Sequence, residues 1–331
     1  MKDKNEKNYI DSVGYDNKRA VDNQYRAALR DILENGEDQE TRLQIEDPIT
    51  GKQRSAVARY KDMVVMEFDL RNGAPLITER NLEKASRGAI AEIIAFINGA
   101  QTLDELDTYG VPRIWWEPQI TDEKTAKRGL KPGALGPASY GPVYHDFPTP
   151  DGTFNQVKAV VDQIRANPEL RTHVMTSFYG PLSFRAPGYD QKVVVVPCHG
   201  SLLHFRINNG ELTLKHVQRS GDMPVGVQFN LIQYTALALM VAAATGYKAT
   251  KYIHVISDAH IYENQFDFVK KFLEREPKPF PKLLINDRVD IDREYQKQSG
   301  KTRADIFSFR ADDFLLDDYE AEPNFRTPTA V

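Results

Sequence analysis

The residues best suited to chemistry lie between Val193 and Asn230. Cys198 is the only cysteine in the 331-residue chain; it follows a run of valines and a proline, and His199 comes directly after it. A chain with one cysteine cannot form an internal disulfide, so Cys198 is either core filler or a reactive thiol. A cysteine at the end of a strand and beside cationic groups can provide a thiolate nucleophile. The flanking proline and histidine favour the reactive interpretation.

A second group of polar residues follows about twenty positions later, in a segment that contains Gly and Pro. Arg219 offers a planar fork suited to phosphate, and Ser220 adds a hydroxyl donor. The alternative is a surface ion pair between Arg219 and Asp222. Asn230 opens an apolar helix, where an asparagine is most often an N-cap. Its amide has one acceptor oxygen and two donor hydrogens, so it can also read the edge of a planar ring.

Two further sets of residues have the composition of a site. Glu92 lies among isoleucines on a predicted helix, where burial raises the pKa of a carboxyl group as a general acid requires. The alternative is that Glu92 faces solvent beside the apolar stripe. Asp258, His260 and Tyr262 follow a predicted strand. The alternative for this set is that Asp258 caps the next helix and His260 stands on its first turn.

The bulk composition excludes several classes of protein. The net charge is −4 and the sequence pI is about 6.0, whereas general nucleic-acid and membrane-surface binders carry a basic excess. An anionic substrate must therefore be held by a few local arginines. We expect no membrane span and no secretory signal, because apolar runs are short and the N-terminus is charged. A lone cysteine is typical of a reducing compartment, so we expect a cytoplasmic protein.

The periodicity of apolar residues predicts mixed helices and strands without regular βαβ alternation, which favours the α+β class. Asn209-Gly210 is typical of a hairpin turn. Two segments, 37–58 and 117–153, are rich in turn residues and are predicted as loops. The predicted helices cover 22–35, 82–98, 154–167, 229–245 and 259–274, and the predicted strands cover 61–70, 173–179, 193–196, 201–208, 211–218 and 252–257.

The domain organisation is predicted to be simple. Residues 1–20 are charged and poor in apolar side chains, which indicates a flexible N-terminal arm. Residues 21–331 are predicted to form a single catalytic domain. Segments 118–134 and 180–190 are expected to be insertions.

Taken together, these segments resemble the thymidylate synthase family from about Asp22 to Val331. The resemblance implies an α+β fold with a large mixed sheet packed with helices and with one sheet face at a dimer interface. Any one segment is a weak signal, but their common order makes coincidence implausible. The matching segments are FDLRNGAPLIT (68–78), LGPASYG (135–141), PTPDG (148–152), PCH (197–199), QRSGD (218–222), GVQFN (226–230), SDAHIY (257–262), REPKPFPKL (275–283) and the terminal TPTAV.

The resemblance implies a reaction between dUMP and 5,10-methylenetetrahydrofolate that gives dTMP and dihydrofolate. Cys198 would attack C6 of the pyrimidine, which makes C5 nucleophilic toward the one-carbon unit. Glu92 would help to protonate the ring oxygen. In this family an asparagine at the position of Asn230 goes with uracil and an aspartate with cytosine. No metal is implied.

The resemblance also assigns roles to individual residues. Tyr140 would lie near the C5 proton, with Tyr144 as an alternative, and Arg42 is preferred over Arg54 as a phosphate ligand. Arg171 would be donated across the interface of a homodimer. The catalytic residues would be Cys198, Glu92, Tyr140, His199, Arg219, Asp222 and Asn230; the substrate-binding residues Arg42, Arg171, Gln218, Arg219, Ser220, Asn230, His260 and Tyr262; and the folate-binding residues Trp115, Asp222, Gly226 and Val331.

Several departures from the family pattern bear on the product. Thr172 replaces the second of two interface arginines, and Pro118 stands where a second tryptophan is common. The 224–230 segment also differs beside the folate. These changes favour, as the runner-up, a dUMP 5-hydroxymethylase of the kind associated with phages carrying modified bases. In such an enzyme water replaces hydride in the last step, unless the ring of Trp115 excludes water. A cytidylate hydroxymethylase and an inactive nucleotide- or RNA-binding homologue are further alternatives.

Overall fold

The computed structural model describes residues 9–46, 50–299 and 303–328. Its centre is a six-stranded sheet with the strand order β2-β3-β9-β8-β7-β6. All neighbours are antiparallel except β8 and β9, which run parallel. The predicted α+β class, with a large mixed sheet packed with helices, is confirmed. The strands are β2 (Glu37–Glu46), β3 (Gln53–Asp69), β6 (Val174–Met175), β7 (Leu202–Asn208), β8 (Glu211–Asp222) and β9 (Lys248–Tyr262).

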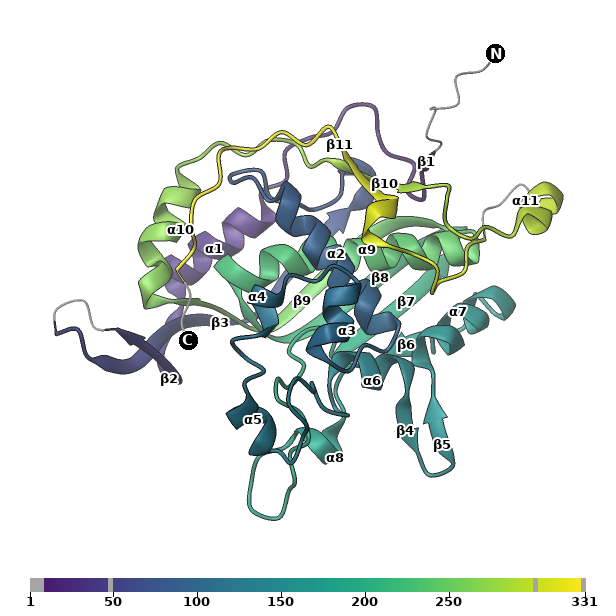
Figure 1. Cartoon of the computed structure of the whole chain (residues 1–331). Coiled ribbons are helices and arrows are strands. Elements are labelled where there is room, and N and C mark those ends of the chain that lie inside the picture. The colour runs from purple at the N-terminus through teal and green to yellow at the C-terminus, as the bar shows by residue number, and fades with distance from the viewer. Residues whose placement is uncertain (1–8, 47–49, 300–302, 329–331) are drawn as a thin grey trace.

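Helix α9 (Gln228–Thr245) is the central element of the core. Nearly all of its residues are buried, because a helix that is apolar all round has to be enclosed. It packs against β8 and β9 on one side and against α2 (Glu83–Ile97) on the other (Figure 1). Gly246 ends it in the left-handed conformation with φ of 81°. Together with the preceding turn, the run Met223–Thr245 is long and apolar enough to cross a membrane, but it is mostly buried in the protein.

Shorter elements surround this core (Figure 1). The small hairpin of β4 and β5 projects from the body beside α6 and α7. The remaining helices are α1 (Gln24–Asn35), α3 (Leu103–Thr108), α4 (Arg113–Trp116), α5 (Asp122–Ala126), α6 (Tyr140–His145), α7 (Gln156–Ala166), α8 (Gly180–Ser183), α10 (Phe266–Leu273) and α11 (Arg293–Ser299), and the hairpin strands are β4 (Phe147–Thr149) and β5 (Gly152–Phe154).

The sheet face opposite α9 carries an apolar row across four strands. Val65 of β3 pairs with Val255 of β9, Val255 with Val217 of β8, and Val217 with Leu202 of β7. Val65 is 54% exposed and Leu202 is 40% exposed. Side chains alternate between the two faces of a strand, so the buried neighbours Leu212 and Leu214 of β8 face the core instead.

The N-terminal segment is held more firmly than its composition indicates. Strand β1 (Tyr9–Ile10) pairs with β10 (Lys282–Asn286), which pairs in turn with β11 (Phe314–Asp317). Val13 is buried, and the hydroxyl of Tyr15 donates to the Leu283 carbonyl at 3.0 Å. The described part of the predicted arm, residues 9–20, is therefore attached to the body. Residues 1–8 lie outside the described residues.

Four local predictions are wrong, and the hairpin turn is confirmed. The segment 117–153, predicted as a loop, contains α5 and α6 and most of the β4–β5 hairpin. The polar segment 37–58 forms most of the β2–β3 ribbon, because cross-strand pairing stabilises strands whose own pattern is weak. The valines at 193–196 form no strand; the Val194 amide donates instead to the Leu135 carbonyl. Strand β9 continues to Tyr262, so the helix predicted from 259 begins only at Phe266. The Asn209-Gly210 hairpin is confirmed, with φ of 50° and 80°.

Candidate active site

Cys198 lies between the irregular valine segment and the body of the sheet. Its carbonyl accepts the amide of Arg219 at 2.9 Å, which ties it to β8. Its own amide donates to the hydroxyl oxygen of Tyr140 at 2.8 Å. The same hydroxyl is 3.6 Å from the Cys198 sulfur. Because the oxygen already accepts a backbone N–H, its proton is available to the sulfur.

Opposing influences act on the thiol of Cys198. Burial raises its pKa, whereas the hydrogen bond from Tyr140 and the charge of Arg219 lower it. Arg219 therefore acts in the expected direction, but burial prevails and the pKa stays above its ordinary value. A carboxylate at Glu92 raises it further. The resting cysteine is a protonated thiol with an oxygen placed to stabilise the thiolate.

Glu92 is fixed from two sides. It projects from α2, and its carboxylate accepts the indole N–H of Trp116 at 2.6 Å and the side-chain amide of Gln233 at 2.8 Å. Burial raises its pKa from an ordinary value near 4.5 to about 7, although both hydrogen bonds oppose the rise. A carboxyl group that is half-protonated near neutral pH can both give and take a proton.

Asn230 is joined to Glu92 through Gln233. Both amides stand on α9 at a spacing of three residues, which places them on one face of the helix. The side-chain amide nitrogen of Asn230 donates to the oxygen of Gln233 at 3.0 Å. Both side chains are buried. Asn230 is therefore not a helix cap, because it is the third residue of α9 and its side chain bonds to Gln233.

His199 is held as a neutral ring. Its Nδ1 lies 2.7 Å from the hydroxyl of Tyr234, and its ring stacks on Tyr140 with centroids 4.4 Å apart. Burial lowers its pKa to about 3. Tyr144, the alternative to Tyr140, bonds instead to the Gly200 carbonyl at 3.3 Å and to Tyr234. Tyr140 is thus the tyrosine that meets the cysteine.

Asp222 occupies the end of β8 with the C-terminal tail beside it. The amide of Gln265 donates to both carboxylate oxygens, at 3.3 and 3.1 Å, and also to the Pro328 carbonyl at 3.2 Å. The Val225 amide provides a further bond at 3.1 Å. Burial raises the pKa of Asp222 to about 6, opposed by the nearby His260.

Ser220 of β8 and Asp258 and His260 of the parallel strand β9 are joined by hydrogen bonds. Ser220 pairs in register with Asp258, and its hydroxyl donates to that carboxylate at 3.0 Å. His260 Nδ1 lies 3.2 Å from the other oxygen of Asp258. Burial lowers the pKa of His260, but the Asp258 carboxylate outweighs this and raises it overall. Asp258 is not a helix cap, because β9 continues through Tyr262.

Comparison with known families decides the identity. A family model described as Thymidylate synthase matches residues 23–331, nearly the whole chain. The chain belongs to the thymidylate synthase family. This is a family of enzymes that transfer a one-carbon unit from a folate to dUMP. The match begins next to Asp22, where the sequence resemblance begins.

The arginines assigned from the thymidylate synthase resemblance lie in different surroundings. The guanidinium of Arg219 donates to the carbonyls of Pro197 and Val196 at 3.0 and 3.1 Å. Arg54 forms a two-pronged ion pair with Glu263, at 2.6 and 2.7 Å. Arg42 is exposed, at an irregularity in the pairing of β2 with β3. Arg171 is exposed just before β6, the strand at the sheet edge.

Gln218 forms its side-chain hydrogen bonds within the protein. It is buried, its oxygen lies 2.9 Å from Nε2 of His254, and its nitrogen donates to the Ser220 carbonyl at 2.9 Å. Both ends of the amide are therefore bonded within the protein. Gln218 supports the backbone at Ser220 instead of projecting beyond it.

The residues predicted to bind folate surround Asp222 and the start of α9. Trp115 is partly buried, with its ring 5.2 Å from that of Phe229. A side chain at Gly226 would approach the Asn230 oxygen to 3.9 Å. Val331 lies outside the described residues. A carboxylate retains lone pairs beyond those used by Gln265 and Val225, so these residues fit a planar pterin with N–H groups.

Sequence reasoning missed two members of the thymidylate synthase site. Trp116 donates to Glu92, whereas the sequence resemblance names only Trp115, as a folate-binding residue. Gln233 links Glu92 to Asn230. The spacing of three residues indicates that Asn230 and Gln233 share one face of α9. The sequence gives no sign that this face lies against Glu92 of α2, because that contact joins distant segments.

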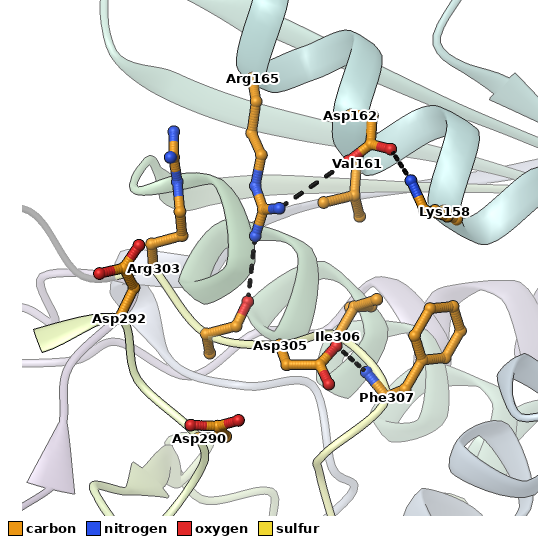
Figure 2. A pocket seen from close by; sticks show the side chains of 11 residues that line it. Lys158, Val161, Asp162, Arg165, Asp290, Asp292, Arg303, Asp305, Ile306 and Phe307 are labelled. Atoms are coloured by element: carbon orange, nitrogen blue, oxygen red, sulfur yellow. Dashed lines mark hydrogen bonds and ion pairs between the residues drawn. The ribbon is translucent and has the colours of Figure 1, made fainter. Parts of the chain in front are cut away.

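A cavity lies between α7 and the segments 290–292 and 303–307 (Figure 2). Arg165 donates to the Ala304 carbonyl at 3.2 Å and lies 3.8 Å from Asp162, which also pairs with Lys158. Asp305 accepts the Phe307 amide at 3.1 Å. These charges stabilise the local structure, and the cavity contains none of the predicted site residues.

Proposed function

We propose that the protein is a thymidylate synthase. It transfers a one-carbon unit from 5,10-methylenetetrahydrofolate to C5 of dUMP and releases dTMP and dihydrofolate. The observation that carries this proposal is the convergence of the Cys198 thiol, the Tyr140 hydroxyl at 3.6 Å, and the chain of bonds from Glu92 to Asn230. The reaction needs a nucleophile, a hydroxyl beside it, an acid and a side chain that recognises the base. Cys198, Tyr140, Glu92 and Asn230 match these roles in that order.

The protein side of the chemistry follows from these contacts. The Cys198 sulfur forms a bond to C6 of the pyrimidine, and the electron pair of the C5–C6 double bond moves toward C5 and O4. Protonated Glu92 donates to O4 as charge develops there. Tyr140 stabilises the thiolate before attack and again when the sulfur leaves. The one-carbon unit takes the place of the C5 proton, which leaves on the side of the Tyr140 hydroxyl. The folate would supply the one-carbon unit and, in the final step, a hydride.

Binding of the nucleotide is divided between its two ends. Asn230 reads the base, while Arg219 and Ser220 meet the 5′-phosphate and His260 and Tyr262 meet the sugar. Arg42 completes the phosphate site in preference to Arg54, because Arg54 is already paired with Glu263 on both prongs. This proposal rests on the family resemblance and on the exposure of Arg42.

The protein is proposed to act as a cytoplasmic homodimer. The exposed apolar row from Val65 to Leu202 is a surface that a second copy would cover, since burial of apolar area drives association. Arg171 stands at the edge strand of the same sheet, from which it would reach the partner's phosphate site. Thr172, the neighbouring position, leaves this site with one fewer cation than the family pattern.

The runner-up is a dUMP 5-hydroxymethylase. The first half of the reaction is the same, but water adds to the one-carbon unit in place of hydride. A carboxyl group with a pKa of about 7 is suited to take a proton from that water, and the altered segment before Phe229 lies beside Trp115. Tight packing of the Trp115 ring against the intermediate would exclude water and favour hydride transfer.

One incubation separates these functions. The protein is mixed with dUMP and methylenetetrahydrofolate, and dihydrofolate absorbance and nucleotide mass are followed together. Dihydrofolate with a methylated nucleotide establishes the synthase. A hydroxymethylated nucleotide without dihydrofolate establishes the hydroxymethylase. No product from folded protein overturns both, and turnover of dCMP in preference to dUMP would establish a cytidylate enzyme. Cys198→Ala is the control, since an enzyme loses turnover and a binding homologue keeps its function.

A further inference from the structure

The hydrogen-bond chain from Glu92 to Asn230 has a direction. An ionised Glu92 carboxylate only accepts hydrogen bonds, and a protonated Glu92 directs its proton at O4 of the base, so in both forms the atom of Gln233 that faces Glu92 is its amide nitrogen. The oxygen of Gln233 then faces Asn230, and Asn230 has to present its nitrogen in return. The distances of 2.8 and 3.0 Å fit this arrangement. Glu92 thus fixes the orientation of the Gln233 amide, and the Gln233 amide fixes that of Asn230.

An asparagine alone does not distinguish uracil from cytosine. Uracil offers an acceptor at O4 and a donor at N3, and cytosine offers a donor at N4 and an acceptor at N3. A rotation of the asparagine amide by 180° exchanges its oxygen and nitrogen and satisfies either base. Discrimination therefore requires something that holds the amide in one orientation.

We propose that Gln233 is a specificity-determining positioning residue, which locks the Asn230 amide in the orientation that accepts uracil and rejects cytosine. The inference rests on the proposed function, because it takes dUMP as the ligand. With one N–H of Asn230 held by Gln233, the other N–H and the oxygen remain for the base. They match O4 and N3–H of uracil. Cytosine would meet a donor against its amino group and an acceptor against its bare N3.

Nucleotide binding in the absence of folate tests the inference. The dissociation constants of dUMP and dCMP are measured by calorimetry for the wild type and for Gln233→Met, which keeps the length of the side chain but removes its amide. The matched control is Gln228→Met. Gln228 is a buried glutamine on the same helix. Among the residues that the structure describes, its amide donates to the backbone carbonyls of Pro224 and Val225, at 2.5 and 3.3 Å.

The expected result is a change in the ratio of the two constants. A mismatched buried polar group changes binding by roughly 5- to 150-fold. The wild type should therefore prefer dUMP by at least about 5-fold, and Gln233→Met should lose most of this preference. Gln228→Met should keep it, even if its melting temperature falls. Where Gln233→Met does not fold, Gln233→Ser makes the same test, because its hydroxyl is too short to bridge Glu92 and Asn230.

Each outcome decides a separate point. A folded Gln233 variant that retains the wild-type ratio of the dUMP and dCMP dissociation constants contradicts the proposed role of Gln233. A wild type that binds dUMP selectively but makes no product overturns the proposed function and leaves the lock standing. A wild type that binds both nucleotides equally, or neither, overturns the lock, because there is then no discrimination for Gln233 to impose.

Discussion

Replacement of Tyr140 by phenylalanine removes a hydroxyl that touches the Cys198 sulfur. The change deletes the 3.6 Å contact to sulfur and leaves the Cys198 amide without its 2.8 Å acceptor. A hydrogen bond to a charged group contributes about 1.5–3 kcal/mol, and sulfur is a weak acceptor, so about 1.5 kcal/mol is the appropriate figure. That energy corresponds to a thiolate fraction about 10-fold smaller at neutral pH.

The single cysteine makes this measurable without substrate. Iodoacetamide reacts with the thiolate, and Cys198 is the only cysteine in the chain, so the alkylation rate reports on one site. The rate is followed from pH 6 to pH 10 for the wild type and Tyr140→Phe. The wild-type curve should rise at a pH above the ordinary thiol value, because burial raises the pKa. The variant curve should be displaced further toward alkaline pH.

Tyr144→Phe is the matched control. Tyr144 is equally buried and lies on the same helix, but its hydroxyl meets Gly200 and Tyr234 instead of the cysteine. Both variants should lose stability, since each leaves a buried partner without its bond. Only Tyr140→Phe should move the alkylation curve. Identical curves for Tyr140→Phe and the wild type would refute a role of this hydroxyl in stabilising the thiolate.

Three further predictions concern other parts of the molecule. The folded-state pKa of Glu92 is about 7 against an ordinary value near 4.5, so the unfolded chain loses this proton first and the group destabilises the fold increasingly from pH 4.5 to 7. Glu92→Gln should therefore raise the melting temperature more at pH 8 than at pH 5, and an equal gain at both would contradict the burial argument. Gln265→Leu removes the bonds to Asp222 and Pro328, so carboxypeptidase should release the tail faster; an unchanged rate would show that this contact does not hold it. Val65→Asp should dissociate the proposed homodimer in sedimentation experiments, whereas Phe154→Asp, at an exposed position on β5, should not; a dimer that persists in Val65→Asp would place the interface elsewhere.

The chemical residues could be predicted from the sequence because they stand in short motifs. Cys198 next to His199, Arg219 next to Ser220, and the alternating Asp258, His260 and Tyr262 keep their order whatever the surroundings. The parallel pairing of β8 with β9 then brings Ser220 opposite Asp258. That alignment depends on strand register, which has no local sequence signal between segments so far apart.

The parts that were not predicted all depend on contacts between distant segments. The β2–β3 ribbon has a polar sequence that is typical of turns, yet β2 is paired with the first half of β3, and β3 is paired with β9 from Ala58 to Asp69. The valines at 193–196 have the composition of a strand, but Leu135 provides their backbone partner. Trp116 and Gln233 join the site only because α4 and α9 both lie against Glu92. Propensity is a weak guide wherever tertiary pairing decides the conformation.

Protonation of Glu92 favours both steps that the site has to carry out, the ionisation of Cys198 and the protonation of the pyrimidine. Ionised Glu92 raises the pKa of Cys198 by repelling the thiolate. Protonated Glu92 removes that repulsion, and it is also the form that can donate to O4 of the pyrimidine. Because the pKa of Glu92 is about 7, both needs are met by a state that is well populated near neutral pH. The burial that raises the pKa of Glu92 therefore supports both the attack by sulfur and the protonation that accompanies it.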